Sequence, residues 1–144
     1  MARYVLDTNQ IIAAGTGWLD VGAPEPDPVC ARRLLVHVVK KETGLYCGKI
    51  IGEYLEKLID RKHPPDRAMR LIQYMMGAFE RVQIETAQAH HPPADPDDEI
   101  FLLCAMDGNA DYLISHDAAL LDVALHYPEF SICRAEVETG RLGI

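Results

Sequence analysis

The sequence has little cysteine, and its four cysteines are not arranged in a C-x-x-C spacing. The usual zinc-ribbon and redox motifs are therefore absent, and the apolar surroundings of Cys47, Cys104 and Cys133 favour buried, reduced thiols. Long apolar runs are also missing, since none approaches the roughly 20 residues that cross a bilayer. The N-terminal segment reaches Asp7 too early for the core of a signal peptide. We therefore expect a cytoplasmic protein without a membrane-spanning segment.

Positive charge is scarce outside the middle of the chain. The 144 residues include 14 Lys and Arg against 22 Asp and Glu, which gives a formal net charge of −8. Such a balance argues against a general nucleic-acid coat protein, which needs a cationic surface to displace counterions. The charge is uneven, because residues 32–81 hold eleven bases and six acids, whereas residues 82–144 hold two bases and twelve acids. This asymmetry is typical of a polyanion-facing surface beside a cation site.

Short apolar runs alternate with helical patterns along the whole chain. The runs predict strands at 4–6, 45–47, 82–84, 112–114 and 130–133. The apolar spacing predicts helices over 11–14, 29–42, 49–61, from Pro65 to Phe79, from Asp97 or Asp98 to Gly108, and over 120–125. A glycine- and proline-rich loop, with Trp18 in it, is predicted over 15–28. The alternation predicts an α/β fold, an α/β/α sandwich with a mostly parallel sheet of five strands, in one domain over 1–144.

Two of the predicted strands lead into an aspartate. Asp7 directly follows the first strand, and Asp117 follows the fourth after Ser115 and His116. Ligands of open parallel sheets bind outside the carboxyl ends of the strands, so the two carboxylates share one crevice if the strands are neighbours. Taken singly, each aspartate could equally cap the start of a helix.

Two further acids are candidates for the same crevice. Asp98 lies in the run 95–99, which contains four acids, and it shares a helical face with apolar residues. Glu53 lies at the edge of the apolar stripe of its helix, where an ordinary surface glutamate is the better interpretation from that segment alone. Four converging carboxylates suit hard divalent cations such as Mg²⁺ or Mn²⁺. Asn9 or Ser115 could then orient a ligand or a water.

These residues occur in the order and spacing of a known family. The segments YVLDTN (4–9), IIGEY (50–54), DPDDEIFL (95–102) and ADYLISHDAALL (110–121) together resemble a PIN domain. That fold is a metal-dependent ribonuclease fold common among the toxins of bacterial and archaeal toxin–antitoxin pairs. No single motif is specific, but the ordered combination covers nearly the whole chain.

The resemblance implies a site and an activity. It places the acidic cluster of the family, and one or two Mg²⁺ or Mn²⁺ ions, on Asp7, Glu53, Asp98 and Asp117. Asn9 matches the polar residue that supports the first aspartate of the family. Ser115 matches the small polar residue that precedes the last aspartate. The implied activity is endoribonuclease cleavage of RNA by metal-activated water, in a toxin with an antitoxin partner and a homodimeric assembly.

The sequence departs from the family pattern at Gln10, at His116, in the long loop 15–28 and at Cys47-Gly48, although every acid is present. Two alternatives remain open: a PIN-like module that binds RNA or protein without cutting, and a nuclease or phosphatase that acts on DNA or on a small phosphoester. Basic side chains of the middle segment are candidates to meet phosphate, namely Arg32, Arg33, Lys49, Lys57, Arg61 and Lys62.

Overall fold

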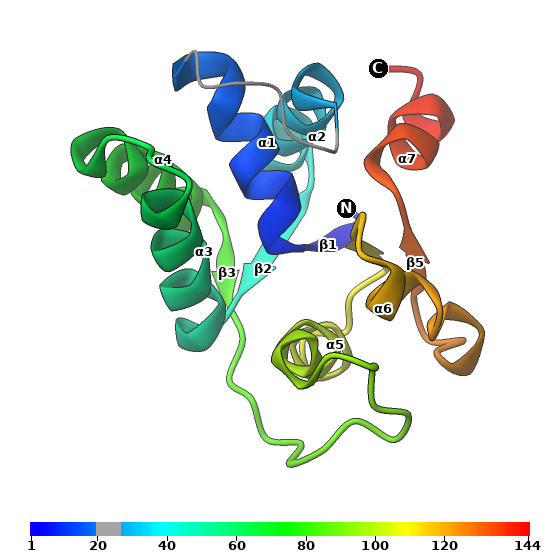
Figure 1. Ribbon diagram of the computed structural model, residues 1–144. Coiled ribbons are helices and arrows are strands. Elements are labelled where there is room, and N and C mark those ends of the chain that lie inside the picture. The colour runs from blue at the N-terminus through cyan, green and yellow to red at the C-terminus, as the bar shows by residue number, and fades with distance from the viewer. Residues whose placement is uncertain (20–26) are drawn as a thin grey trace.

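The structure is a computed structural model that describes residues 1–19 and 27–144. Its strands are β1 (Arg3–Leu6), β2 (Thr43–Tyr46), β3 (Glu80–Arg81), β4 (Tyr112–Ile114) and β5 (Ser131–Cys133). They form one parallel sheet in the order β3-β2-β1-β4-β5 (Figure 1). Strand β1 is therefore central, and the chain order runs outward from it in both directions.

Helices connect the strands on both faces of the sheet. They are α1 (Thr8–Leu19), α2 (Pro28–Lys41), α3 (Gly48–Asp60), α4 (Pro65–Ala78), α5 (Glu99–Asp107), α6 (Ala118–Leu121) and α7 (Ala135–Leu142). Single 3₁₀ turns occur at Pro96–Asp98 and Ala124–His126. Figure 1 shows α1 and α2 on one side of the central strands and α5 on the other. The predicted α/β fold with a five-stranded parallel sheet is confirmed.

Helix α1 is longer than the sequence predicted, because Gly15 does not end it. An added Cβ at Gly15 would meet the ring of His63 and the side chain of Leu71, both at 3.2 Å. The glycine therefore allows α1 to pack closely against the α3–α4 region, and the prediction that a loop begins at residue 15 is wrong. The rest of that predicted loop, at 20–26, lies outside the described residues, as does the Trp18 side chain.

The third strand comes earlier than predicted, at Glu80–Arg81 instead of 82–84. The Val82 N–H still reaches the Tyr46 carbonyl at 2.7 Å, but the chain then leaves the sheet. The Asp107 carboxylate accepts the N–H groups of Glu85 and Thr86 at 2.7 and 2.9 Å, so this segment pairs with the end of α5 instead of with β2.

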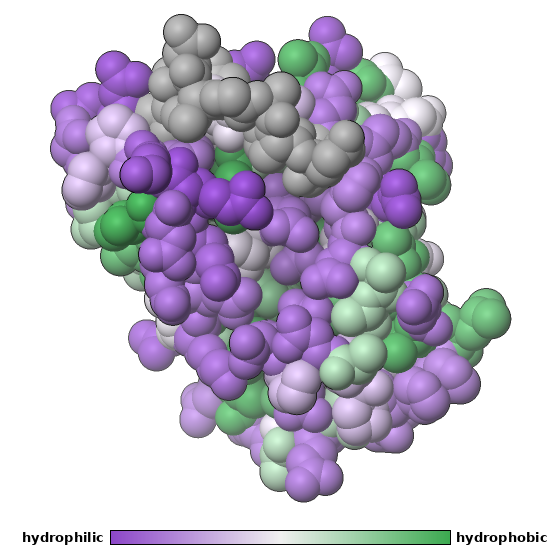
Figure 2. All heavy atoms as spheres, viewed as in Figure 1, coloured by the Kyte–Doolittle hydropathy of each residue, from purple (hydrophilic) through white to green (hydrophobic). Residues whose placement is uncertain are grey.

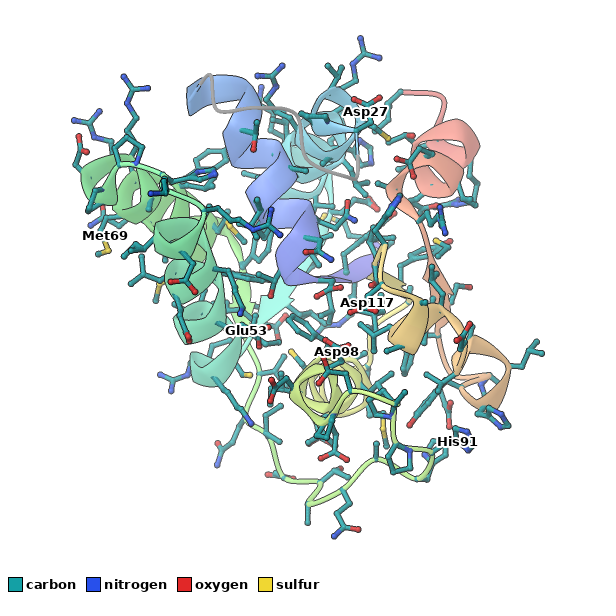
Figure 3. All side chains as sticks on the ribbon, viewed as in Figure 1. Asp27, Glu53, Met69, His91, Asp98 and Asp117 are labelled. Atoms are coloured by element: carbon teal, nitrogen blue, oxygen red, sulfur yellow. The ribbon has the colours of Figure 1, made fainter. Side chains whose placement is uncertain are left out.

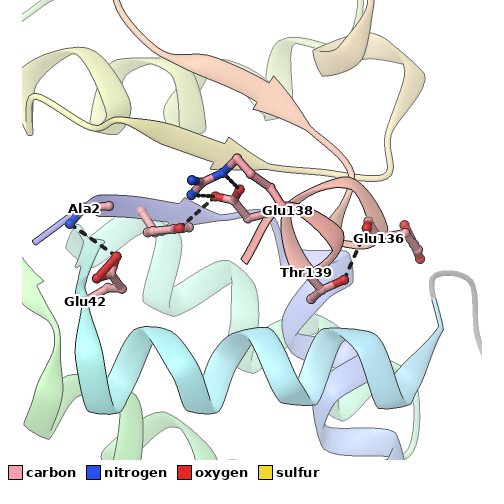
Figure 4. A network of polar contacts seen from close by, with 7 residues as sticks. Ala2, Glu42, Glu136, Glu138 and Thr139 are labelled. Atoms are coloured by element: carbon pink, nitrogen blue, oxygen red, sulfur yellow. Dashed lines mark hydrogen bonds and ion pairs between the residues drawn. The ribbon is translucent and has the colours of Figure 1, made fainter. Parts of the chain in front are cut away.

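Helix α7 was not predicted, because its buried face is polar. The buried Glu138 carboxylate accepts the Tyr4 hydroxyl at 2.7 Å and the Arg141 Nη2 at 3.1 Å (Figure 4). The Arg141 guanidinium also lies 4.8 Å from the centre of the Tyr112 ring. These contacts hold α7 against β1 and β4. Because they are polar, the hydrophobic periodicity of the sequence does not predict them.

Two smaller expectations also changed. Helix α6 ends at Leu121, and the predicted helix to residue 125 is replaced by the 3₁₀ turn. Cys47 and Cys104 are buried as expected, whereas Cys133 is only half-buried. In the part of the chain that the structure describes, no helix has the length and apolar character needed to cross a membrane.

Candidate active site

The candidate site lies where β1 and β4 end side by side. Leu6 pairs with Ile114 in the parallel register, so the next residues, Asp7 and Ser115, stand next to each other. The Asp7 N–H continues the ladder by donating to the Ile114 carbonyl at 2.9 Å. Strand β1 is also the point from which the strand order runs in opposite directions. In open α/β sheets, such a switch point opens the crevice that binds ligands.

Asp7 is a buried carboxylate held by two donors. Its side chain is only 3% exposed. The Ser115 hydroxyl donates to Oδ2 at 2.6 Å, and the Thr8 N–H donates to Oδ1 at 2.7 Å. The pKa of Asp7 is raised to about 6, mainly by burial and also by the charges of Asp117 and Glu53, while the two hydrogen bonds act in the opposite direction. The fold therefore holds this carboxylate at a cost that a nearby cation would relieve.

Glu53 reaches the same crevice from α3. Its neighbour Tyr54 is fully buried and donates its hydroxyl to the Leu6 carbonyl, which fixes α3 against the end of β1. The Thr8 hydroxyl donates to Glu53 Oε1 at 3.2 Å and so links this side chain to the Asp7 segment. Burial is the main cause that raises the pKa of Glu53, with the charge of Asp97 adding to it.

Asp117 both caps a helix and faces the crevice. Its Oδ1 accepts the Ala119 N–H at 3.0 Å at the start of α6, and its own N–H donates to Ser115 Oγ at 3.0 Å. Ser115 therefore bridges Asp7 and Asp117. The capping role and the site role, which the sequence left as alternatives, are compatible in one residue.

Asp98 carries the least satisfied oxygen of the group. It is 6% exposed at the end of the 3₁₀ turn before α5, and its buried Oδ2 has no hydrogen-bond partner. Burial raises the pKa of Asp98 to about 8, helped by the adjacent Asp117 carboxyl group and by the charge of Asp7. An unpartnered buried carboxylate oxygen costs stability unless a ligand or cation meets it.

These side chains line one open cleft with a volume of about 370 Å³. Figure 3 shows Glu53, Asp98 and Asp117 near one another, on α3, on the turn before α5 and at the start of α6, and Figure 2 shows hydrophilic residues over the middle of this face. The lining residues are Asp7, Thr8, Asn9, Ile12, Glu53, Lys57, Asp60, Arg61, Asp95, Asp97, Asp98 and Asp117.

Comparison with known proteins identifies the family. A sequence model of the PIN domain matches residues 3–119. The chain belongs to the PIN domain family. No curated protein matches the sequence. A solved structure of VapBC2 from Rickettsia felis, bound to a DNA fragment from its promoter, contains a similar fold with a TM-score of 0.55 and 12% identity. That match covers 90% of this chain and 96% of the other.

Several residues of this PIN cleft were not predicted from the sequence. The N–H and hydroxyl of Thr8 contact two of the four acids, although Thr8 was not a candidate site residue. Asp97 is exposed, and it also lines the cleft. Asn9 lines the cleft as well, whereas the donors to Asp7 are Ser115 and Thr8. The signal available in the sequence was position, since Thr8 directly follows the strand-ending aspartate.

The six candidate phosphate-binding residues of the PIN domain are separated by the fold. Lys57 and Arg61 line the acidic cleft. Lys49 lines a neighbouring hollow, and Arg32 and Arg33 line a third hollow beside α2. Lys62, the sixth, is an exposed residue directly after Arg61. A phosphodiester in the acidic cleft would thus meet Lys57 and Arg61 first.

The donor set of the PIN cleft fits a hard divalent cation. The four acids offer only oxygen, which Mg²⁺ and Mn²⁺ prefer, and one of these oxygens is buried without a partner. Among residues 1–19 and 27–144, no three acidic, histidine or cysteine side chains already stand in a geometry that could hold a metal ion. Binding an ion therefore requires the carboxylates to turn toward one another from these positions.

Proposed function

We propose that this PIN domain is a Mg²⁺- or Mn²⁺-dependent endoribonuclease. The observation that supports the proposal is the gathering of four carboxylates in one cleft at the carboxyl ends of β1 and β4. Burial and mutual repulsion raise the pKa values of Asp7, Glu53 and Asp98, which is the electrostatic state that a bound cation would stabilise.

The residues of the cleft would divide the work. Asp7, Glu53, Asp98 and Asp117 would hold the ion. When bound, such an ion activates water and stabilises charge on a phosphodiester. The Ser115 hydroxyl fixes the direction of the Asp7 carboxylate and accepts the backbone N–H of Asp117, and Lys57 and Arg61 would bind phosphates of the RNA chain beside the cut. No covalent bond to the protein is needed.

We further propose that the chain is the toxin of a toxin–antitoxin pair that acts in the cytoplasm. The likeness of its fold to VapBC2 supports an antitoxin partner. A homodimer remains part of the proposal, and α4 offers a candidate surface, because Met69 and Met76 are each 43% exposed. Ile72, on the same helix, packs in the core. Light scattering of the purified chain, with a monomer as the opposing result, tests the dimer.

Cleavage by active-site variants tests the nuclease. Asp7→Asn and Asp117→Asn should abolish Mn²⁺-dependent cleavage of RNA, because each removes a charged ligand, while circular dichroism shows an intact fold. Asp122→Asn, an exposed aspartate just beyond α6, is the matched control and should cleave normally. Undiminished cleavage by both site variants would contradict the assignment.

A comparison of substrates separates the alternatives. The protein is incubated with RNA, single-stranded DNA and duplex DNA in Mn²⁺ and, in parallel, in EDTA. Faster cleavage of either DNA would replace the RNA proposal with a DNA nuclease. Calorimetry tests the non-catalytic module, because a chain with no Mn²⁺ binding that depends on Asp98 would be a binding module.

A further inference from the structure

Two cysteines from different elements meet in the interior. Cys47 is the N-cap residue immediately before α3, and Cys104 lies in α5. The two residues are 4% and 0% exposed, and each thiol is the largest influence on the pKa of the other. Ile100, one turn before Cys104 in α5, lines the same hollow as Cys47. Both cysteines are free thiols in this structure. The sequence has no C-x-x-C pair, but the fold brings together two cysteines that are 57 positions apart.

The two thiols have different character. The neighbouring Cys104 thiol lowers the pKa of Cys47 to about 6, and the first turn of α3 and the Lys49 ammonium act in the same direction. The Cys47 sulfur, together with burial, raises the pKa of Cys104. Cys47 is therefore the thiolate of the pair, and Cys104 is the protonated partner beside it.

The Cys47 thiolate can be reached from solvent by a small molecule. It lines an open hollow of about 650 Å³ together with Lys49, Arg81 and Ile100. The backbone at Gly48 leaves the approach clear, since an added Cβ would meet only the Arg81 guanidinium, 3.8 Å away. Reactive cysteines occur in such electropositive and partly accessible surroundings.

The remaining two cysteines lack these features. The sulfur of Cys30 lies 3.1 Å from the Thr139 hydroxyl, and burial raises its pKa. Burial raises the pKa of Cys133 to about 11, so that its thiolate is scarce at neutral pH. Selective chemistry at Cys47 is the consequence.

We propose that Cys47 and Cys104 form a peroxide-reactive dithiol that closes to an intramolecular disulfide between α3 and α5. The Cys47 sulfur attacks one oxygen of hydrogen peroxide, the O–O bond breaks, and the leaving hydroxide takes a proton to become water. The Cys104 sulfur then attacks the Cys47 sulfenic acid, the S–O bond breaks, and the thiol proton leaves with the hydroxide as a second water. Two thiols are oxidised by two electrons, and one peroxide is reduced to two waters.

The disulfide would connect two helices that carry acids of the cleft. Glu53 lies in α3 after Cys47, and Asp98 immediately precedes α5. The proposed chemistry does not rest on the nuclease activity, because it concerns the hollow of Cys47 and not the acidic cleft.

Peptide mapping of the peroxide-treated wild-type chain tests the proposal. Stoichiometric hydrogen peroxide at pH 7 should lower the intact mass by two hydrogens. After alkylation and digestion, the Cys47 and Cys104 peptides should appear as one linked species that dithiothreitol separates. Cys47 should react on the order of ten-fold faster than Cys133, because far more of it is thiolate.

Variants give the second measurement. Cys104→Ser should stop at a sulfenic acid on Cys47, which dimedone traps, and Cys133→Ser should form the same disulfide as the wild type. A linkage through Cys30 or Cys133, a disulfide between two chains, or peroxide-treated protein in which Cys47 stays reduced would each overturn the proposal. The wild-type map decides this even if the Cys104→Ser chain fails to fold.

Discussion

Without metal, the charge of the buried Asp7 should lower the stability of this PIN domain, and Asp7→Asn should therefore stabilise it. The fold raises the pKa of Asp7 from 3.8 to about 6, so the folded chain holds its proton more tightly than the unfolded chain does. At 1.36 kcal/mol per pH unit, that difference amounts to roughly 3 kcal/mol of destabilisation once the pH exceeds both values. Asparagine carries no charge and so avoids this destabilisation. It loses about 1 kcal/mol of folding free energy, because its single amide oxygen cannot accept from both Ser115 and Thr8.

The sign follows from the proton balance. Between pH 4 and pH 6 the folded wild type binds more protons than the unfolded wild type, so its stability falls as the pH rises. In EDTA at pH 8, Asp7→Asn should therefore be more stable than the wild type by about 2 kcal/mol, or roughly 6 °C in melting temperature. Below pH 4 the advantage should vanish, because Asp7 is then protonated in both states.

Urea denaturation in EDTA at pH 4, 6 and 8 measures the effect, with Asp97→Asn as the control. Asp97 lines the same cleft but is exposed, so its replacement should change stability by less than about 0.5 kcal/mol at any pH. Mn²⁺ at 100 times its dissociation constant should then stabilise the wild type by about 2.7 kcal/mol and stabilise Asp7→Asn far less. The reasoning is refuted if Asp7→Asn is no more stable than the wild type at pH 8, or if its advantage does not depend on pH.

Two further predictions concern the last helix and the rim of the cleft. Tyr4→Phe removes a hydrogen bond to the buried Glu138 carboxylate and should lower the free energy of unfolding by about 2 kcal/mol. Tyr74→Phe, at an exposed site, should change that free energy little. Equal effects of the two variants in urea denaturation would count against a stabilising role of the buried Glu138 carboxylate. Arg61→Gln should reduce the slope of log K for single-stranded RNA binding against log salt concentration by about 0.7, whereas Arg33→Gln should not change it. Fluorescence anisotropy without added metal measures both slopes. An equal change in both variants would place the RNA across both hollows.

The strand ends were predictable from the sequence, and with them the position of the cleft. Short apolar runs that stop at Asp7 and before Ser115 predict parallel strands, and parallel strands bring their ends to the same edge of the sheet. That Glu53 joins them was not visible in its own segment. It follows from the buried contact of Tyr54 with the Leu6 carbonyl, which links residues 48 positions apart.

The failures share a physical cause, which is that tertiary contacts override local signals. Gly15 resembles a helix stop, but its lack of a side chain serves the approach of His63 and Leu71. Glu138 resembles a solvated helix residue, but it is 1% exposed and bonded to Tyr4. In both cases the contacting residue is remote in sequence, so neither composition nor periodicity could predict the contact.

The distribution of the four acids along the chain has a consequence for its synthesis. Asp7 is made more than a hundred residues before its neighbour strand β4 and the last of the four acids, Asp117. A ribosome-bound fragment that stops before β4 lacks one of the two strands that border β1 and also lacks the Ser115 hydroxyl that holds Asp7. The nascent chain therefore cannot assemble the cleft before β4 and Asp117 have been made, and the proposed cutting activity against RNA would be absent until then.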